Sequence, residues 1–282
     1  MKTIAKSQAP VIELLKELSP DSSNNTLRSW IEKGRVMVAG KVVNRSTHPV
    51  LAGQEVSVGP RVQFARGDIK ILFEDDHIVV LEKPEGLLSV ATDFHDEYTA
   101  HTILKRRRHP GRVFPVHRLD RETSGVMIFA YTEAARDSLK EQFEKRLIEK
   151  IYIAIVEGKV AAKTGTWESY LKEDGNFFVS STRSEKMGKL AISHYEVIAQ
   201  NSRYTSLKVK LQTGRKNQLR VHCSEAGFPI VGDKKYGASS NPIKRLCLHA
   251  HSVAFDHPVL GKRMRFEIPL PDDFQRIVQF EL

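Results

Sequence analysis

The stretch FPVHRLDRETSGVMIFA, Phe114–Ala130, decides how the rest of the chain is interpreted. Its apolar ends predict two strands, and the polar segment His117–Gly125 lies between them. Within that segment Arg118 and Arg121 flank Asp120. Because nearby positive charge favours the ionised form of a carboxylate, we expect Asp120 to be available as a nucleophile or general base. The alternative is a structural turn or ion pair, the commoner role of an aspartate between arginines.

Composition limits the class of protein. The chain has 282 residues, enough for one large domain or for a large domain accompanied by a small one. Hydrophobic residues make up 40% and charged residues 28%, which is typical of a globular protein. The formal net charge of +10 favours a polyanionic partner, because basic surfaces bind phosphate backbones. A basic surface that is solvated and has no partner is the alternative.

The cysteines and apolar runs predict a compartment. Cys223 and Cys247 lie in apolar surroundings, as expected of buried thiols in a reducing cytoplasm. No long apolar run is present near the N-terminus, so we expect no signal peptide. No stretch approaches the roughly 20 apolar residues of a membrane span. These observations favour a cytoplasmic protein with no membrane partner.

The N-terminal part of the chain has the pattern of a small α/β module. Residues 1–9 are polar and are expected to be loose, and two amphipathic helices and a tight hairpin follow. Ser22, Ser23 or Asn24 can cap the second helix. Basic residues gather here, as phosphate contacts require. The candidate RNA-binding residues of this module are Arg28, Lys33, Arg35 and Lys41.

The order LRSWIEKGRVMVAGKVVN, then LAGQEV, resembles the small RNA-binding module named after the ribosomal protein S-four. The resemblance implies such a module over residues 10–59. Residues 60–70 read as a linker, and residues 71–282 form the expected second domain. A small protein-docking domain is the alternative for the first part.

The densest basic run of the chain, KRRRH, follows a short helix expected between Thr99 and Leu104. We expect Arg106, Arg107 and Arg108 to lie in a loop that contacts RNA phosphates. A solvated loop without a ligand is the alternative.

Two further segments carry candidate site residues. Ile148–Val156 predicts a strand in which Tyr152 is a single aromatic among aliphatic residues, a pattern that core residues also show. Thr213–His222 predicts a strand end, a glycine turn and the start of a helix. Because helix N-termini collect anions, Arg215 in this segment is a candidate RNA-binding residue.

Two histidines of one predicted strand could bind a metal or be structural. His249 and His251 share one face of a predicted strand, which would suit a metal-dependent hydrolase, but no third ligand lies at a familiar spacing. We therefore expect hydrogen-bonded histidines and no metal. The sequence also has no phosphate-loop glycine pattern, nucleophilic serine elbow or Cys–His pair, so no cofactor is expected.

Four separated stretches resemble, in order, the catalytic domain of the RluA-type RNA pseudouridine synthases, and the resemblance spans residues 71–282. They are IVVLEKPEGLLS (78–89), VHRLDRETSG (116–125), KIY (150–152), and LQTGRKNQLRVH (211–222) followed by PIVGDKKYG (229–237). The segment LCLHAHSVAFDHP (246–258) agrees as well. The fold implied is a mixed α+β domain built on a mainly antiparallel sheet with a central cleft.

The resemblance also implies roles for individual residues. Asp120 would be the nucleophile that assists cleavage of the uridine glycosidic bond before the uracil rejoins the ribose through carbon. Tyr152 would stack on the uracil and help in proton removal. Arg220 would pair with Asp120, and Arg118 would help to displace the target base. The reaction is an isomerisation, which needs no metal and no cofactor.

One position departs from the pattern, and the substrate is open. Asn217 stands where the family commonly has the histidine of GR-x-H-Q, although an asparagine can still donate and accept hydrogen bonds. The resemblance favours large-subunit ribosomal RNA as substrate, with transfer RNA as the runner-up. A non-catalytic RNA-binding or ribosome-assembly protein on the same fold is the alternative.

Overall fold

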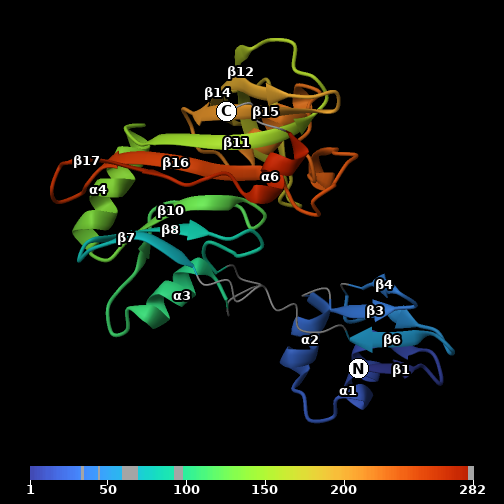
Figure 1. Cartoon of the computed structure of the whole chain (residues 1–282). Helices are drawn as coiled ribbons and strands as arrows, with labels where there is room; N and C mark the ends of the chain where they lie inside the picture. The colour runs from blue at the N-terminus through green and yellow to red at the C-terminus, as the bar shows by residue number, and fades with distance from the viewer. Residues whose placement is uncertain (33–34, 44, 59–68, 92–97, 279–282) are drawn as a thin grey trace. The chain divides into compact units, whose positions relative to one another are not determined.

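The computed structural model describes residues 1–32, 35–43, 45–58, 69–91 and 98–278 (Figure 1). The chain divides into two compact units, Met1–Arg66 and Gly67–Leu282. Lys33 and all but the end of the expected linker 60–70 lie outside the described residues.

The first unit pairs two helices with short antiparallel strands. Its elements are β1 (Lys2–Ile4), β2 (Ala9–Pro10), α1 (Val11–Leu18), α2 (Asn24–Glu32), β3 (Val36–Val38), β4 (Lys41–Val42), β5 (Pro49–Val50) and β6 (Glu55–Val58). The strand order is β1-β6-β3-β4, with β2 and β5 paired separately. Residues 2–4, expected to be loose, pair instead with β6, since Thr3 lies opposite Val56 in the antiparallel register.

Local sequence explains the boundaries of this unit. Ser23 caps α2, because its Oγ accepts a hydrogen bond from the Thr26 backbone N–H at 3.2 Å. Ala39 and Gly40, with φ of 48° and 76°, make the tight turn between β3 and β4. Apolar faces of both helices close on the strands in one core. It contains Val11, Leu14, Leu15, Leu27, Ile31, Val36, Val38, Val50, Val56 and Val58.

The second unit is built on an 11-stranded sheet, among the described residues. The strands are β7 (Lys70–Glu74), β8 (Ile78–Lys83), β9 (Phe114–Pro115), β10 (Ser124–Ala130), β11 (Glu149–Glu157), β12 (Thr164–Glu173), β13 (Val179–Thr182), β14 (Lys189–Gln200), β15 (Tyr204–Leu211), β16 (Leu248–Asp256) and β17 (Arg263–Glu267). The main order is β13-β12-β14-β15-β11-β16-β10-β8-β7. The expected mixed, mainly antiparallel α+β fold is confirmed.

One short parallel pairing joins two antiparallel halves of this sheet. Strands β10 and β16 run parallel where Ser124 lies opposite His249 and Gly125 lies opposite Ala250. On its other side Ala250 lies opposite Tyr152 of β11. A Cβ atom on Gly125 would lie 2.3 Å from the Ala250 carbonyl oxygen, so only glycine allows this approach. The join therefore brings the segment preceding β10 close to β11.

Helices cover parts of the sheet and differ in places from expectation. They are α3 (Ala100–Arg107), α4 (Glu133–Glu144), α5 (Gln218–Glu225), the 3-10 turn η1 (Lys234–Tyr236) and α6 (Asp272–Ile277). Thr99 caps α3, which extends through Arg107, so the basic run begins in a helix and not in the expected loop. In the described part of the chain, no helix is long and apolar enough to cross a membrane.

Candidate active site

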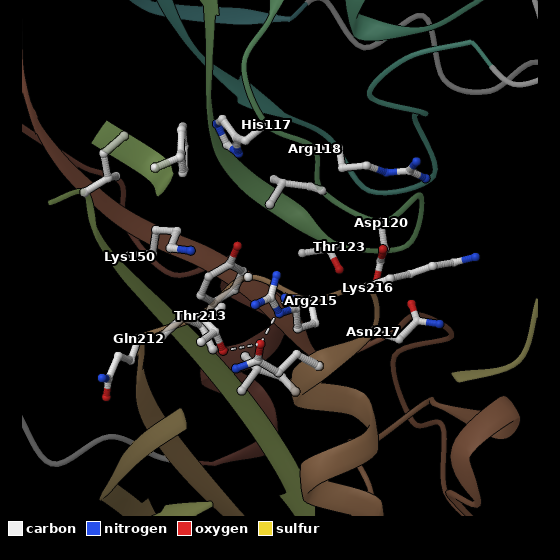
Figure 2. Close-up of a pocket in the computed structure, with 18 of the residues that line it drawn as sticks. His117, Arg118, Asp120, Thr123, Lys150, Gln212, Thr213, Arg215, Lys216 and Asn217 are labelled. Atoms are coloured by element: carbon white, nitrogen blue, oxygen red, sulfur yellow. Dashed lines mark hydrogen bonds between the residues drawn. The ribbon is translucent and has the colours of Figure 1, made fainter. Parts of the chain in front are cut away.

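A cavity of about 490 Å³ lies where the segment before β10 meets β11 and the start of α5 (Figure 2). Its volume is within the range of ligand sites, about 300–1,000 Å³. The cavity lining includes five residues that the sequence predicted: Arg118, Asp120, Tyr152, Arg215 and Arg220. Cationic side chains outnumber acidic ones in this lining. The charged lining residues are Arg118, Asp120, Glu144, Arg146, Lys150, Arg215, Lys216 and Arg220.

Hydrogen bonds from the turn that follows β8 hold the backbone of Leu119 and Arg121, the residues on both sides of Asp120. Ser89 Oγ donates a hydrogen bond to the Leu119 carbonyl oxygen at 2.7 Å and accepts one from the Leu119 N–H at 3.0 Å. The Gly86 N–H donates to the Arg121 carbonyl oxygen at 2.9 Å. These bonds explain why KPEGLLS accompanies HRLDRE in the sequence, since one turn fixes the other.

Lys83 completes this support from inside the protein. Its side chain is fully buried, and Nζ donates to backbone carbonyl oxygens that include those of Leu87 at 2.7 Å and Arg121 at 3.2 Å. Burial lowers the pKa of Lys83 to about 7, while the charges of Glu122 and Asp120 oppose this shift. The ammonium is thus a positioning group for the loop that carries Asp120.

Burial dominates the electrostatics of Asp120. It raises the pKa of the Asp120 carboxyl above its ordinary value, whereas the positive charges of Arg220 and Arg118 lower it. The expectation that neighbouring arginines determine its ionisation is therefore wrong about the larger effect. The physical reason is desolvation, which a sequence does not reveal because it depends on the surrounding fold.

Arg220 has a different partner from the one expected. Its Nε and Nη2 bond the two carboxylate oxygens of Asp233 at 2.6 and 2.7 Å, and Nη1 lies 3.7 Å from Glu122 Oε2. Among the described residues, no ion pair within 4.0 Å joins Arg220 to Asp120, so the expected pairing is wrong. Arg220 acts on Asp120 through its nearby charge. Sequence reasoning missed Asp233, although it lies in the quoted segment PIVGDKKYG.

Tyr152 lies half-buried beside this acid. A register shift between Ile151 and Tyr152 in the pairing with β16 marks a bulge, a feature that redirects side chains next to active sites. Burial, followed by the negative charge of Asp120, raises the pKa of Tyr152. The phenol therefore stays protonated, which suits stacking and hydrogen-bond donation better than the expected removal of a proton.

Lys150 is a cavity residue that sequence reasoning did not assign. It lies two residues before Tyr152 on β11, and this spacing places both side chains on one face of a strand. Burial lowers the pKa of Lys150 to about 8, with a further contribution from Arg215. A Cβ atom on Gly214 would lie 3.0 Å from Lys150 Nζ, so glycine leaves room for the ammonium. Figure 2 shows Lys150 across the cavity from Asp120.

The segment before α5 contains the turn and the helix start that the sequence predicted. Arg215 is exposed at the cavity, and its Nε donates to the Leu190 carbonyl oxygen at 3.0 Å. Asn217 is buried in a left-handed conformation, φ 52°, and its Nδ2 donates to the Tyr236 hydroxyl at 3.0 Å. Asparagine and histidine both adopt this conformation more readily than most residues. The departure at this position therefore preserves the backbone.

The remaining RNA-binding candidates lie outside the cavity lining. Arg107 Nη2 bonds Glu74 Oε2 at 2.6 Å, and the Arg108 guanidinium lies 3.8 Å above the Tyr131 ring. Both contacts attach the end of α3 to the sheet, which explains why the basic run is not a free loop. Arg106 is exposed.

In the first unit Arg28 is exposed, and Arg35 lies over the Trp30 ring at 5.2 Å. The side chain of Lys41 lies, with Lys33, outside the described residues.

The two histidines of the metal-hydrolase alternative have other partners. His249 Nδ1 lies 2.8 Å from Ser124 Oγ, and His251 Nε2 lies 3.3 Å from Glu267 Oε1. Within the ranges that the structure describes, no group of three or more His, Cys, Asp or Glu side chains could hold a metal ion.

Comparison with known proteins assigns the family. Residues 77–225, which include Asp120, Tyr152 and Arg220, match the family described as RNA pseudouridylate synthase. The chain belongs to this family. It is therefore an RNA-modifying isomerase, and the resemblance seen in the motifs is confirmed.

Curated relatives extend the match to most of the chain. A protein of Pseudomonas aeruginosa named ribosomal large subunit pseudouridine synthase D is 35% identical over 93% of this chain and 88% of its own length. The Haemophilus influenzae protein of the same name is 30% identical over 94% and 89%, respectively. The solved structure of human RNA pseudouridylate synthase domain containing 4 superimposes with a TM-score of 0.61 at 25% identity, covering 73% of this chain and 90% of that chain.

Proposed function

We propose that this pseudouridine synthase acts on uridines of large-subunit ribosomal RNA and that Asp120 is its nucleophile. The observation that carries the assignment is the carboxylate of Asp120, whose two neighbouring residues are held through their backbone, next to Tyr152 in a cavity rich in cations. Relatives named as ribosomal large subunit enzymes, which align over nine-tenths of the chain, support the substrate. Transfer RNA is the runner-up.

The reaction begins with a uridine extruded from the RNA, because a base inside a folded strand is not accessible to an enzyme. The uracil stacks on Tyr152, and the exposed guanidinium of Arg118 occupies the vacated position in the stack. The Asp120 carboxylate forms a transient covalent bond with the substrate as the N1–C1′ bond breaks. After the base rotates, C5 bonds to C1′ and the bond between Asp120 and the substrate breaks, which regenerates the carboxylate. C5 loses its proton and N1 gains one, so the composition is unchanged.

Surrounding charges adapt the cavity to these steps. Arg220, held by the buried Asp233, supplies a fixed positive charge near Asp120 and favours its ionised, nucleophilic form. Lys150 and Arg215 provide positive charge elsewhere in the cavity, where the RNA backbone or a uracil anion would be stabilised. Tyr152 contributes a neutral ring.

The first unit is proposed to hold RNA in the manner of the S-four-like module. Its exposed Arg28 and the cation of Arg35 are the described candidates for phosphate contacts. Arg106 near the end of α3 is a further candidate, while Arg107 and Arg108 would reach RNA only if their contacts with Glu74 and Tyr131 were exchanged. A cytoplasmic location accompanies the proposed ribosomal substrate.

The test is a pseudouridine assay on unmodified large-subunit ribosomal RNA and on bulk transfer RNA, with sites mapped by carbodiimide-blocked reverse transcription. We expect product in the ribosomal RNA with the wild type and none with Asp120→Asn. Glu144→Gln is the matched control, because it removes another carboxylate from the same cavity and should keep activity. Product from Asp120→Asn at the wild-type rate would refute the nucleophile, and product in transfer RNA alone would refute the substrate.

A further inference from the structure

An exposed phenylalanine lies at the turn that links β12 and β13. Phe177 is 64% exposed, the largest value for a phenylalanine in the described part of the chain. Its φ of 60° is left-handed, a conformation unfavourable for a bulky side chain. Strained residues that persist in a structure often have a functional reason. Neither burial nor backbone preference accounts for this ring.

The turn itself is rigidly built. Asp174 Oδ1 accepts hydrogen bonds from the N–H groups of Asn176 and Phe178, each at 2.9 Å. The Phe177 N–H donates to the Asp174 carbonyl oxygen at 3.0 Å. Phe178 stacks on Tyr236 with ring centroids 5.1 Å apart. The neighbouring ring is thus anchored to the fold, and Phe177 is presented to solvent at a defined place.

Lysines surround the exposed ring and connect it to the cavity. Lys216 Nζ lies 5.3 Å from the centre of the Phe177 ring, and Lys216 also lines the cavity that contains Asp120. Glu173 forms an ion pair with Lys216. Lys235 Nζ donates to the Phe177 carbonyl oxygen at 3.4 Å. An aromatic face with adjacent cations is the combination with which proteins bind single-stranded nucleic acid, because bases stack on the ring and phosphates contact the cations.

We propose that Phe177 is a stacking platform for an unpaired base of the RNA strand whose uridine enters the cavity, with Lys216 and Lys235 beside the phosphates. The proposal rests on the proposed function only in taking the bound RNA to be the substrate RNA. RNA is favoured over a protein partner because cations flank the ring and because the same lysine reaches the substrate cavity.

The experiment measures RNA binding by the full-length protein, independently of product formation. The probe is a fluorescein-labelled single-stranded oligouridylate of about 12 nucleotides, matching the site sizes of such proteins. Fluorescence anisotropy is compared for the wild type and for Phe177→Asn, Phe177→Leu and Phe177→Trp. Phe177→Asn serves as the folding control, because asparagine tolerates the left-handed conformation and should leave the melting temperature unchanged or raised.

We expect Phe177→Asn and Phe177→Leu to weaken binding about 5-fold to 100-fold, the effect of losing one stacked base, and Phe177→Trp to retain it. The salt dependence should be unchanged in all of them, since no charge is altered. Equal affinity of the wild type and Phe177→Asn would overturn the platform and would leave the ring to a protein contact. The platform would also be overturned if Phe177→Leu bound RNA more weakly only under conditions where its lowered melting temperature leaves it partly unfolded.

The outcome separates this proposal from the assignment of function. Wild-type protein that forms no pseudouridine but binds the oligouridylate through Phe177 would preserve the platform and refute the proposed substrate. Active protein whose affinity is the same in all variants would preserve the function and refute the platform.

Discussion

Replacement of Gly125 by alanine tests whether the join between β10 and β16 positions the active site. A Cβ atom there would lie 2.3 Å from the Ala250 carbonyl oxygen, whereas ordinary contacts begin at 3.4 Å. The strands must therefore separate by about 1 Å, a displacement that can cost on the order of 10²-fold in rate when it misplaces reacting groups. Since Ala250 also lies opposite Tyr152, the change acts directly on the spacing between the Asp120 loop and β11.

The stability cost of the same change has two parts. Gly125 has φ of 127°, a conformation that side chains rarely adopt, and the clash with backbone atoms adds to this strain. Together we expect a loss of about 2–4 kcal/mol in the free energy of unfolding. Gly261→Ala is the matched control, because Gly261 has φ of 63° and no neighbouring atom within 4 Å. It should lose only about 1–2 kcal/mol, with an unchanged rate.

Both variants would be compared by urea denaturation and by the single-turnover rate of pseudouridine formation under conditions where each is fully folded. We expect Gly125→Ala to be about 10²-fold slower than Gly261→Ala. A Gly125→Ala enzyme that is as fast as Gly261→Ala would refute the reasoning that this glycine determines the distance between the loop and β11.

Other expectations concern the charged groups of the site. Asp120→Asn should raise the free energy of unfolding at neutral pH, because burial raises the pKa of this carboxyl and so opposes its ionised form. This gain in stability should vanish as the pH falls below the ordinary aspartate range. A stability difference that grows on acidification would contradict the prediction. The RNA affinity of the wild type should fall as the pH rises through about 8, because Lys150 loses its charge. Lys150→Met should bind RNA more weakly below pH 8 and should not show this pH dependence. A wild-type affinity that is constant across this range would argue against a role for the ammonium. Asp233→Asn should destabilise the protein by about 3–5 kcal/mol, because it leaves the charge of the buried Arg220 without its partner. The activity of Asp233→Asn should fall further than that of Gly261→Ala. Chemical denaturation would measure the loss of stability, and the pseudouridine assay would measure the loss of activity.

Local patterns predicted most of the elements, because helix periodicity, strand alternation and caps depend on neighbouring residues. Thr99 and Ser23 cap helices near the expected places, and Asp120 and Tyr152 do meet in one cavity. Long-range partners were harder to predict. The strand at residues 2–4 forms only because β6, some 50 residues later, provides a pairing edge, and a polar sequence contains no sign of that edge.

The charged residues show the same limit. Arg220 was expected to pair with Asp120, but Asp233 binds the Nε and Nη2 edge of its guanidinium, and a choice between two acids depends on the packing of the turn at η1. The raised pKa of Asp120 likewise depends on burial, which its arginine neighbours in the sequence do not indicate. Arg107 and Arg108 were expected in a loop that contacts RNA phosphates, yet they contact Glu74 and Tyr131. Charge patterns predicted a basic protein, but the partners depend on the fold.

The join between β10 and β16 also affects how the enzyme comes into existence. Ser124 and His249, which face each other there and share a hydrogen bond, are 125 residues apart in the chain. During synthesis Ser124 leaves the ribosome long before His249 does. The growing chain therefore carries the Asp120 loop for a long time without β16, the strand that places this loop beside Tyr152. Contacts of such long sequence separation form late in folding. The nascent protein can therefore have a basic, folded N-terminal unit while its capacity to modify RNA is still absent.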